Sequence, residues 1–274
     1  ENTEWLDDLG TAHAHLAGAL AARDDRPEAE AELRQAVRVS RTLSDKDPEN
    51  ADYLRHLAVR LGSLGDHLRD DGELGEARRH YEESLGIRRR LVDRDPERSG
   101  WRIELVSLLD RLADLAERQE DDASALACHE EAIVEKRKLV ELRPADGVRA
   151  HALAYSLWCV GTAYEASGRT KEALDILREA MAFHREAAVQ IPRHAQEHHF
   201  WRDAYHRVVL AVGLEGLDVS ADHLAYAYLQ HAGKDYAAAV AGWRAALRDD
   251  AIRGDLQRGN LYNAACSAAL AGQP

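Results

Sequence analysis

The sequence predicts an all-α fold built from repeated pairs of antiparallel helices. Three columns of residues recur every 48 positions, which is within the range of about 20–50 residues typical of solenoid repeats. The first column holds proline, the second holds alanine and the third holds alanine or glycine. The columns are Pro48, Pro96, Pro144 and Pro192; Ala29, Ala77, Ala125 and Ala173; and Ala17, Gly65, Ala113 and Gly161.

Each unit of the repeat is predicted to contain two helices. In the second unit, leucines recur at helical spacing over its first half, at Leu57, Leu61, Leu64 and Leu68. Over its second half the same spacing is kept by Leu74, Ala77, Tyr81, Leu85 and Leu91. Gly72 lies between the two halves, where a left-handed backbone costs little for glycine. Pro96 ends the second helix, because proline lacks an N–H and restricts the residue before it.

The columns resemble the tetratricopeptide repeat, whose pattern is W-x-x-L-G-x-x-Y, then A-x-x-x-F, then P. The second unit matches it with Leu61, Leu64, Gly65, Leu68, Ala77, Tyr81 and Pro96. The fourth unit matches it with Leu157, Val160, Gly161, Tyr164, Ala173, Leu177 and Pro192. The third unit matches less closely. The resemblance implies a right-handed α-α superhelix in which the first helix of each pair lines a concave groove.

The repeat is longer than the family's usual one of about 34 residues. The spacing places about seven extra residues at the end of each second helix and about seven at the start of the next first helix, close to two turns each. Such long repeats are similar to tetratricopeptide regions attached to some bacterial serine/threonine kinases and related signalling proteins.

Two regions of different regularity are expected along the chain. Residues 1–216 should hold four to five helix pairs, with boundaries near the four prolines, and residues 217–274 should hold degenerate repeat-like helices. After Pro192 we expect helices at 195–213, 218–231, 234–248 and 261–272. The chain starts with Glu1 rather than Met, and its last repeat-like helix has no partner; both features are typical of a fragment.

Charge and composition exclude several classes of function. The 36 Lys and Arg against 49 Asp and Glu give a formal charge of −13, which repels phosphates, so we expect neither nucleic acid nor a membrane as partner. Cys128, Cys159 and Cys266 are far apart, which favours buried thiols in a reducing cytoplasm over disulfides or a zinc knuckle. Phosphate-binding glycine motifs and a nucleophile elbow are absent from the sequence, so we expect no cofactor and no enzyme.

By the register of the resemblance, three aspartates face the middle of the groove: Asp66, Asp110 and Asp114. The Lys, Arg and Asn that grip a carboxylate in some family members are missing from the matching places. We therefore predict a protein or peptide partner with basic character. The alternative is that these aspartates are simply solvated, because exposed charges usually need no partner.

The character of the groove changes toward its C-terminal end. The residues placed there are His151, Tyr155, Trp158, Thr162, His199, Asp203 and His206. Exposed aromatic side chains on such a face are typical anchors for a bound peptide or ring. The alternative is that Tyr155 and Trp158 pack against the next repeat, as large aromatics often do. Trp201 and Tyr205 fall in core columns instead.

His199, Asp203 and His206 share one helix face, because they are spaced i, i+4 and i+7. This geometry is compatible with zinc or nickel, but the chain has 14 histidines, so we expect such clustering by chance and no metal.

Two classes of function follow. The leading hypothesis is an interaction module or scaffold that holds a peptide or protein segment in its groove, as the regulatory or sensor part of a larger signalling protein. The alternative is a small-molecule or metal-binding pocket, catalytic or not, at the C-terminal end of the groove. Convergent His and Asp side chains would favour the pocket. The sequence does not indicate an oligomeric state.

Overall fold

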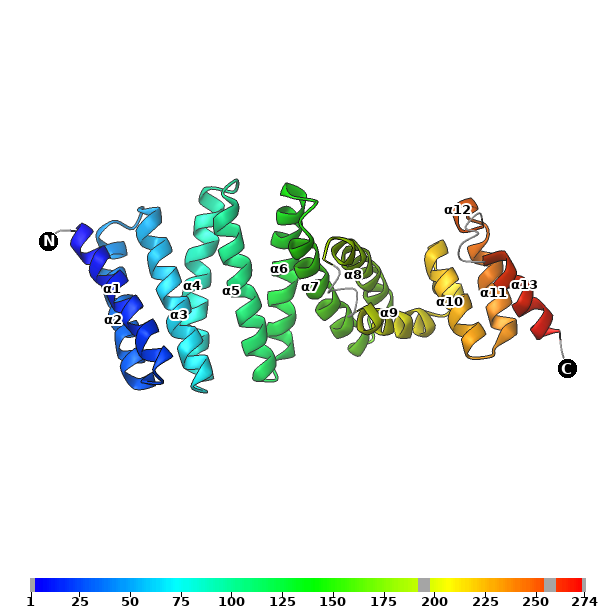
Figure 1. Ribbon diagram of the computed structural model, residues 1–274, viewed down its shortest axis with the longest axis horizontal. Helices are drawn as coiled ribbons and strands as arrows, with labels where there is room; N and C mark the ends of the chain where they lie inside the picture. The colour runs from blue at the N-terminus through cyan, green and yellow to red at the C-terminus, as the bar shows by residue number, and fades with distance from the viewer. Residues whose placement is uncertain (1–2, 192–197, 254–259, 273–274) are drawn as a thin grey trace. The chain divides into compact units, whose positions relative to one another are not determined.

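The computed structural model describes residues 3–191, 198–253 and 260–272. Within these ranges every regular element is a helix, as predicted (Figure 1). None of these helices combines the length and the apolar character that a membrane span requires. The chain divides into two compact units, residues 1–143 and residues 144–274, and each is described by itself.

The first unit consists of three helix pairs that follow one another along the chain (Figure 1). The helices are α1 (Thr3–Ala22), α2 (Arg26–Lys46), α3 (Ala51–Asp70), α4 (Leu74–Arg94), α5 (Ser99–Arg118) and α6 (Asp122–Leu142). The second helices α2, α4 and α6 each end two residues before one of the predicted boundary prolines. The loss of the proline N–H therefore coincides with the helix end, as the sequence predicts.

The turn inside each pair has one residue with a left-handed backbone. In the first unit these residues are Asp24, Gly72 and Glu120, with φ of 65°, 84° and 56°. The next residue donates its N–H back to a carbonyl five residues earlier, as from Glu73 to Leu68 at 2.8 Å. This bond satisfies a carbonyl at the end of the first helix, which has no partner within the helix itself.

The core of the first unit is formed by the predicted leucine columns. Leu57, Leu61, Leu64 and Leu68 of α3 are all less than 5% exposed and pack in one cluster with Tyr81 of α4. Gly65 allows this packing, since a Cβ on it would lie 2.5 Å from the Tyr81 ring. The column of small residues is therefore a requirement of close helix approach.

The second unit begins with a pair of the same length and continues less regularly. Its elements are α7 (Gly147–Ala166), α8 (Thr170–Gln190), α9 (His198–Val212), the 3₁₀ turn η2 (Leu214–Gly216), α10 (Ser220–Ala232), α11 (Tyr236–Ala246), α12 (Asp250–Arg253) and α13 (Asn260–Ala271). The helices predicted after Pro192 are present, with α9 to α11 and α13 within three residues of their expected bounds in the described ranges.

The repeat is interrupted at α9. Gly168 continues the series of left-handed turns with φ of 77°, but the next turn of the same kind is at Lys234, 66 residues later instead of 48. There Asp235 donates to Gln230 over 2.9 Å, the bond found in the other turns. The pair α10–α11 is thus a complete but short repeat, with helices of 13 and 11 residues. In the described ranges, no second helix of the usual 21 residues follows α9.

Candidate functional site

The predicted groove face of the first unit contains a hollow of about 460 Å³ along α3 and α5. Two of the three predicted aspartates, Asp110 and Asp114, line it, and the side chain of Ile103 is 45% exposed beside them. The full lining consists of Arg69, Ile103, Val106, Ser107, Asp110, Arg111 and Asp114. The hollow therefore offers apolar contact and charges of both signs.

Each predicted aspartate is paired with a cation of the same unit. Asp66 accepts hydrogen bonds from the Tyr81 hydroxyl and from Arg111, both at 2.7 Å. Asp114 lies 3.1 Å from the Nε of Arg118. The negative charge of this face is therefore partly neutralised, more than the sequence register alone indicates.

The charge of Asp110 is neutralised by a buried lysine of α6, the second helix of the same pair. The Nζ of Lys136 donates to Asp110 over 2.7 Å, although Lys136 itself is only 4% exposed. One repeat earlier, Arg88 takes the same position and reaches Glu104 at 3.2 Å. Burial lowers the pKa of the Arg88 guanidinium, and the neighbouring Glu104 opposes that shift. A buried charge is tolerated when it is paired in this way.

Lys136 and Arg88 belong to a column of buried polar residues that sequence reasoning missed. The column consists of Ser40, Arg88, Lys136 and His184, spaced by 48 residues, and all four are 7% exposed or less. The sequence did contain a signal for this column, namely a polar residue at a fixed interval within a stripe of apolar residues. In the first unit Lys136 of this column pairs with Asp110 of the groove face, and in the second unit the column supplies a histidine ring.

His184 belongs to an aromatic cluster in the second unit. Its ring stacks on Trp201 with centroids 4.9 Å apart and planes 15° apart. Three further rings lie edge-on to Trp201, those of His151 at 5.9 Å, Trp158 at 6.1 Å and Tyr155 at 6.4 Å. The structure therefore brings His151, Tyr155 and Trp158 together, as the sequence register places them on one face.

The members of this cluster differ in exposure. Trp201 is 3% exposed and Tyr205 is 9% exposed, which confirms their prediction as core residues. Tyr155 is 46% exposed, whereas His151 and Trp158 are half-buried. Trp158 thus packs against the core, as the alternative interpretation expects, while Tyr155 presents its ring at the surface. The role of these rings as anchors stays a prediction.

Three of the remaining predicted residues, Thr162, Asp203 and His206, can be placed in the described part of the chain. The hydroxyl of Thr162 donates to two carbonyls of its own helix, those of Trp158 and Cys159, at 3.0 Å. Asp203 is exposed, and the half-buried His206 lies with its ring 5.9 Å from Tyr205. The side chain of His199 lies outside the described residues, so the metal and small-molecule alternative stays a prediction.

Within the described part of the first unit, one group of side chains has the proximity of metal ligands: Glu30, His67 and Asp71. Arg34 donates to Glu30 over 2.7 Å, and Arg26 forms an ion pair with Asp71. Because guanidinium cations already lie against both carboxylates, they would repel a metal ion. We assign no metal to this group.

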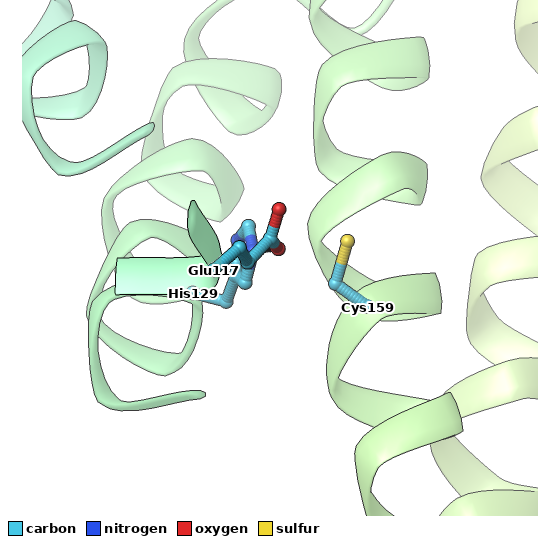
Figure 2. A group of neighbouring side chains, drawn as sticks. All are labelled: Glu117, His129 and Cys159. Atoms are coloured by element: carbon cyan, nitrogen blue, oxygen red, sulfur yellow. Dashed lines mark hydrogen bonds and ion pairs between the residues drawn. The ribbon is translucent and has the colours of Figure 1, made fainter. Parts of the chain in front are cut away.

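A second histidine–carboxylate contact joins the two helices of one pair. Figure 2 shows His129 of α6 with Glu117 of α5, whose atoms Nε2 and Oε1 are 3.3 Å apart. Cys159, drawn in the same figure, belongs to the second unit and is not part of this pair. His129 is 6% exposed and occupies the column of Tyr81, so its role is to fill the core of the pair.

Comparison with known proteins supports the repeat assignment. A family model described as "Tetratricopeptide repeat" matches residues 57–97 and 153–196. These segments include α4 and α8, the second helices of the two units with the clearest sequence pattern. No curated protein matches the chain.

The chain is also similar to several solved structures. The chain is 13% identical to a signal transduction ATPase with numerous domains from Pyrococcus horikoshii, which has a tetratricopeptide repeat sensor; the TM-score is 0.50. The match covers 97% of this chain and 36% of that one, so the chain spans about a third of that protein's length. The structure of pilF from Pseudomonas aeruginosa is 15% identical with a TM-score of 0.37, covering 94% of this chain and 98% of that one. A tetratricopeptide repeat protein from Parabacteroides merdae is 13% identical with a TM-score of 0.38, covering 94% and 99%.

Proposed function

We propose that this chain, a tetratricopeptide repeat protein, binds a segment of a partner protein through the aromatic face of α7 in its second unit. Proteins of this fold are generally protein-interaction scaffolds without catalytic activity, and we give the chain no catalytic role. The observation that carries the proposal is the aromatic cluster, in which the exposed ring of Tyr155 and the half-buried ring of Trp158 adjoin the buried Trp201.

The cluster suits binding because the buried Trp201 fixes the positions of its two more exposed rings. Tyr155 and Trp158 have ring centroids 6.2 Å apart, and both contact Trp201 edge-on. Rings fixed in this way lose little conformational entropy when a ligand docks, which raises affinity. Aromatic anchors with a partly polar edge are typical hot spots of protein interfaces. An apolar or aromatic side chain of the partner would pack against Tyr155.

In the first unit we propose contact with basic side chains of a partner. Asp110 and Asp114 each have one cation of the chain nearby, and a carboxylate has two oxygens that together accept several hydrogen bonds. A lysine or arginine of the partner would take the remaining positions, with its aliphatic part on Ile103. We further propose a cytoplasmic sensor or regulatory role within a larger signalling protein. Its support is the long repeat type and the fold shared with part of the signalling ATPase, a protein that has a tetratricopeptide repeat sensor.

Affinity capture with matched variants tests the aromatic face. The double variant Tyr155→Ala, Trp158→Ala should lose the proteins that the wild-type chain retains from lysate of its source organism. Trp5→Ala is the control, because Trp5 of α1 is 60% exposed and lies in the other unit. If the double variant retained the same proteins in the same amounts as Trp5→Ala, the aromatic face would not be the binding site.

The acidic contact is tested separately with a lysine- and leucine-containing peptide at low salt. Asp110→Asn and Asp114→Asn remove charge but keep an acceptor for Lys136 and Arg118. We expect the two changes together to weaken binding about fivefold, an effect that should shrink at high salt. Asp93→Asn on α4 is the control, since Asp93 is exposed outside the groove face. Equal affinity of all variants would leave the proposal of basic partners without support.

A further inference from the structure

Arginines recur in one column of the second helices, and two of them pair with the next second helix within the first unit. The sequence places Arg41, Arg89, Arg137 and Arg185 at intervals of 48 residues. In the first unit, Arg41 of α2 donates to both carboxylate oxygens of Glu83 on α4, at 2.6 and 3.0 Å. Arg89 of α4 donates in the same way to Glu131 on α6, with its Nε at 2.8 Å. Both glutamates stand 42 residues after their arginine.

The last arginine of the column has lost this partner. The position 42 residues after Arg185 is Ala227, a fully buried residue of α10. In the described part of the chain, the hydrogen bond of Arg185 goes to the Met181 carbonyl of its own helix, at 3.2 Å. Arg185 lacks this glutamate because the repeat is interrupted after α9. A 21-residue second helix that carries the glutamate is expected at this place, and the short helix α10 follows instead.

A cavity of about 240 Å³ lies beside Arg185, within the second unit. One face of α8 and one face of α10 form its walls, and Tyr205 of α9 contributes the third side. The lining residues are Arg178, Met181, Arg185, Tyr205, Ala221, Leu224, Ala225 and Tyr228. Apart from the arginines and the phenol groups, the lining is apolar. Pockets for drug-sized ligands hold about 300–1,000 Å³, so this smaller cavity suits one large side chain.

Arg178 lies two turns before Arg185 on α8, and its guanidinium has a carboxylate partner. It donates through Nε to both oxygens of Asp222, at 3.1 and 3.2 Å, and Asp222 is fully buried. The hydroxyl of Tyr205 donates to the same carboxylate over 2.5 Å. Burial and the hydrogen bond to Asp222 raise the pKa of Tyr205, so its hydroxyl stays a donor. The two arginines flank one cavity, and within the described residues only Arg178 has a carboxylate there.

We propose that this cavity is a second docking site, which receives an acidic amphipathic helix of a partner protein. One apolar side chain of that helix enters the cavity between Met181 and Leu224. A glutamate one turn away pairs with Arg185, as Glu83 pairs with Arg41 and Glu131 with Arg89. Among the described residues the Arg185 guanidinium has no carboxylate partner, so its charge selects a carboxylate of the partner. The register of the repeat supplies the geometry of a helix beside α8. The site lies on α8 and α10, so it is independent of the aromatic face proposed above.

An array of labelled helical peptides tests the site on the full chain. Each peptide is alanine-based, with one apolar residue and, four residues later, Glu, Gln or Lys. We expect a peptide with Leu or Phe and Glu to bind about two- to fivefold more tightly than its Gln counterpart, the range of an exposed ion pair. On the variant Arg185→Glu the preference should reverse, so that the Lys peptide binds best. Tyr155→Ala, Trp158→Ala should bind the array as the wild type does.

Two further variants separate the cavity from general charge effects. Ala221→Trp should block the cavity, and because Ala221 is exposed the chain should still fold, which circular dichroism checks. Arg244→Glu makes the same charge change at an exposed residue of α11 outside the cavity and should bind like the wild type. The proposal is overturned if no Glu peptide is preferred over Gln, or if Arg185→Glu and Arg244→Glu behave alike. If a free C-terminal carboxylate were preferred over an internal Glu, the occupant would be a chain terminus and not a helix. If the chain self-associated and Arg185→Glu abolished this self-association, the occupant would be a second copy of the chain.

Discussion

At the residue scale, the backbone of the turns shows a conflict between local preference and repeat geometry. The left-handed position of the turn is taken by Gly72 and Gly168 but also by Asp24, Glu120 and Lys234. A side chain at positive φ brings its Cβ close to the following carbonyl, which costs about 1–2 kcal/mol. The repeat keeps this geometry even where glycine is absent, because the turn bond and the helix packing on both sides require it.

Replacing Glu120 by glycine should therefore stabilise the protein. We expect Glu120→Gly to raise the free energy of unfolding by about 0.5–1 kcal/mol, since relief of the left-handed strain exceeds the entropy cost of glycine. Gly72→Ala is the mirror experiment and should lower the same quantity by about 1 kcal/mol. Chemical denaturation measures both. A lower stability of Glu120→Gly would mean that its side chain makes a contact that outweighs the strain.

Charged residues show at the same scale what sequence reasoning could and could not reach. The register placed Asp110 and Asp114 on the face that lines the hollow, where the structure has them. It could not show that Lys136 and Arg118 lie against them, because side-chain direction depends on packing. His184 was missed although its column has a signal, a polar residue every 48 positions within an apolar stripe.

At the element scale, the approach of the two helices in a pair depends on one small residue. A Cβ at Gly65 would lie 2.5 Å from Tyr81, and one at Gly161 would lie 2.6 Å from Leu177. In each of these two helix pairs, the backbone of the first helix therefore contacts a large side chain of the second helix. This contact explains why these two units hold glycine in the third column, where the other two hold Ala17 and Ala113.

Gly65→Ala should destabilise the chain, although alanine favours helix. We expect a loss of about 1–3 kcal/mol, because the added methyl group displaces the fully buried Tyr81 ring. Gly86→Ala, on the same unit's α4, is the control: nothing lies within 4 Å of its added Cβ, so the free energy of unfolding should rise by about 0.5–1 kcal/mol. Thermal or urea unfolding distinguishes the two signs. A neutral Gly65→Ala would show that α3 and α4 can separate without cost.

At the scale of the whole molecule, stability is divided among neighbouring helices. The first unit has a leucine-rich core that includes α3, α4 and α5, whereas Trp243 and Leu224 belong to a separate cluster of α10 and α11. In a repeat protein each element contacts its neighbours along the chain, so damage should stay local. The break after α9 adds to this separation, because α9 has no 21-residue partner helix to follow it.

Trp243→Ala tests this local character. Trp243 is 1% exposed, and its Nε1 donates to Ser267 over 3.2 Å. We expect the truncation to cost about 3–5 kcal/mol locally and to speed hydrogen exchange in α10, α11 and α13. Exchange in α3 and α4 should not change. Trp243→Phe, which keeps most of the ring, should have a smaller effect on the same helices. Faster exchange throughout the chain would mean that the two units unfold together.

The sequence by itself determined the helix pairs, their 48-residue period and their core columns, including the burial of Trp201 and Tyr205. These features follow from local spacing: apolar residues at helical intervals, a turn residue and a terminating proline. Only the tertiary structure decided which charges are neutralised and which remain available. The partners of Asp66 and Asp110 lie 45 and 26 residues away. In the part of the chain that the structure describes, a change of helix length in the next repeat leaves Arg185 without a carboxylate. Such pairings depend on the packing of separate helices, which no short stretch of sequence encodes.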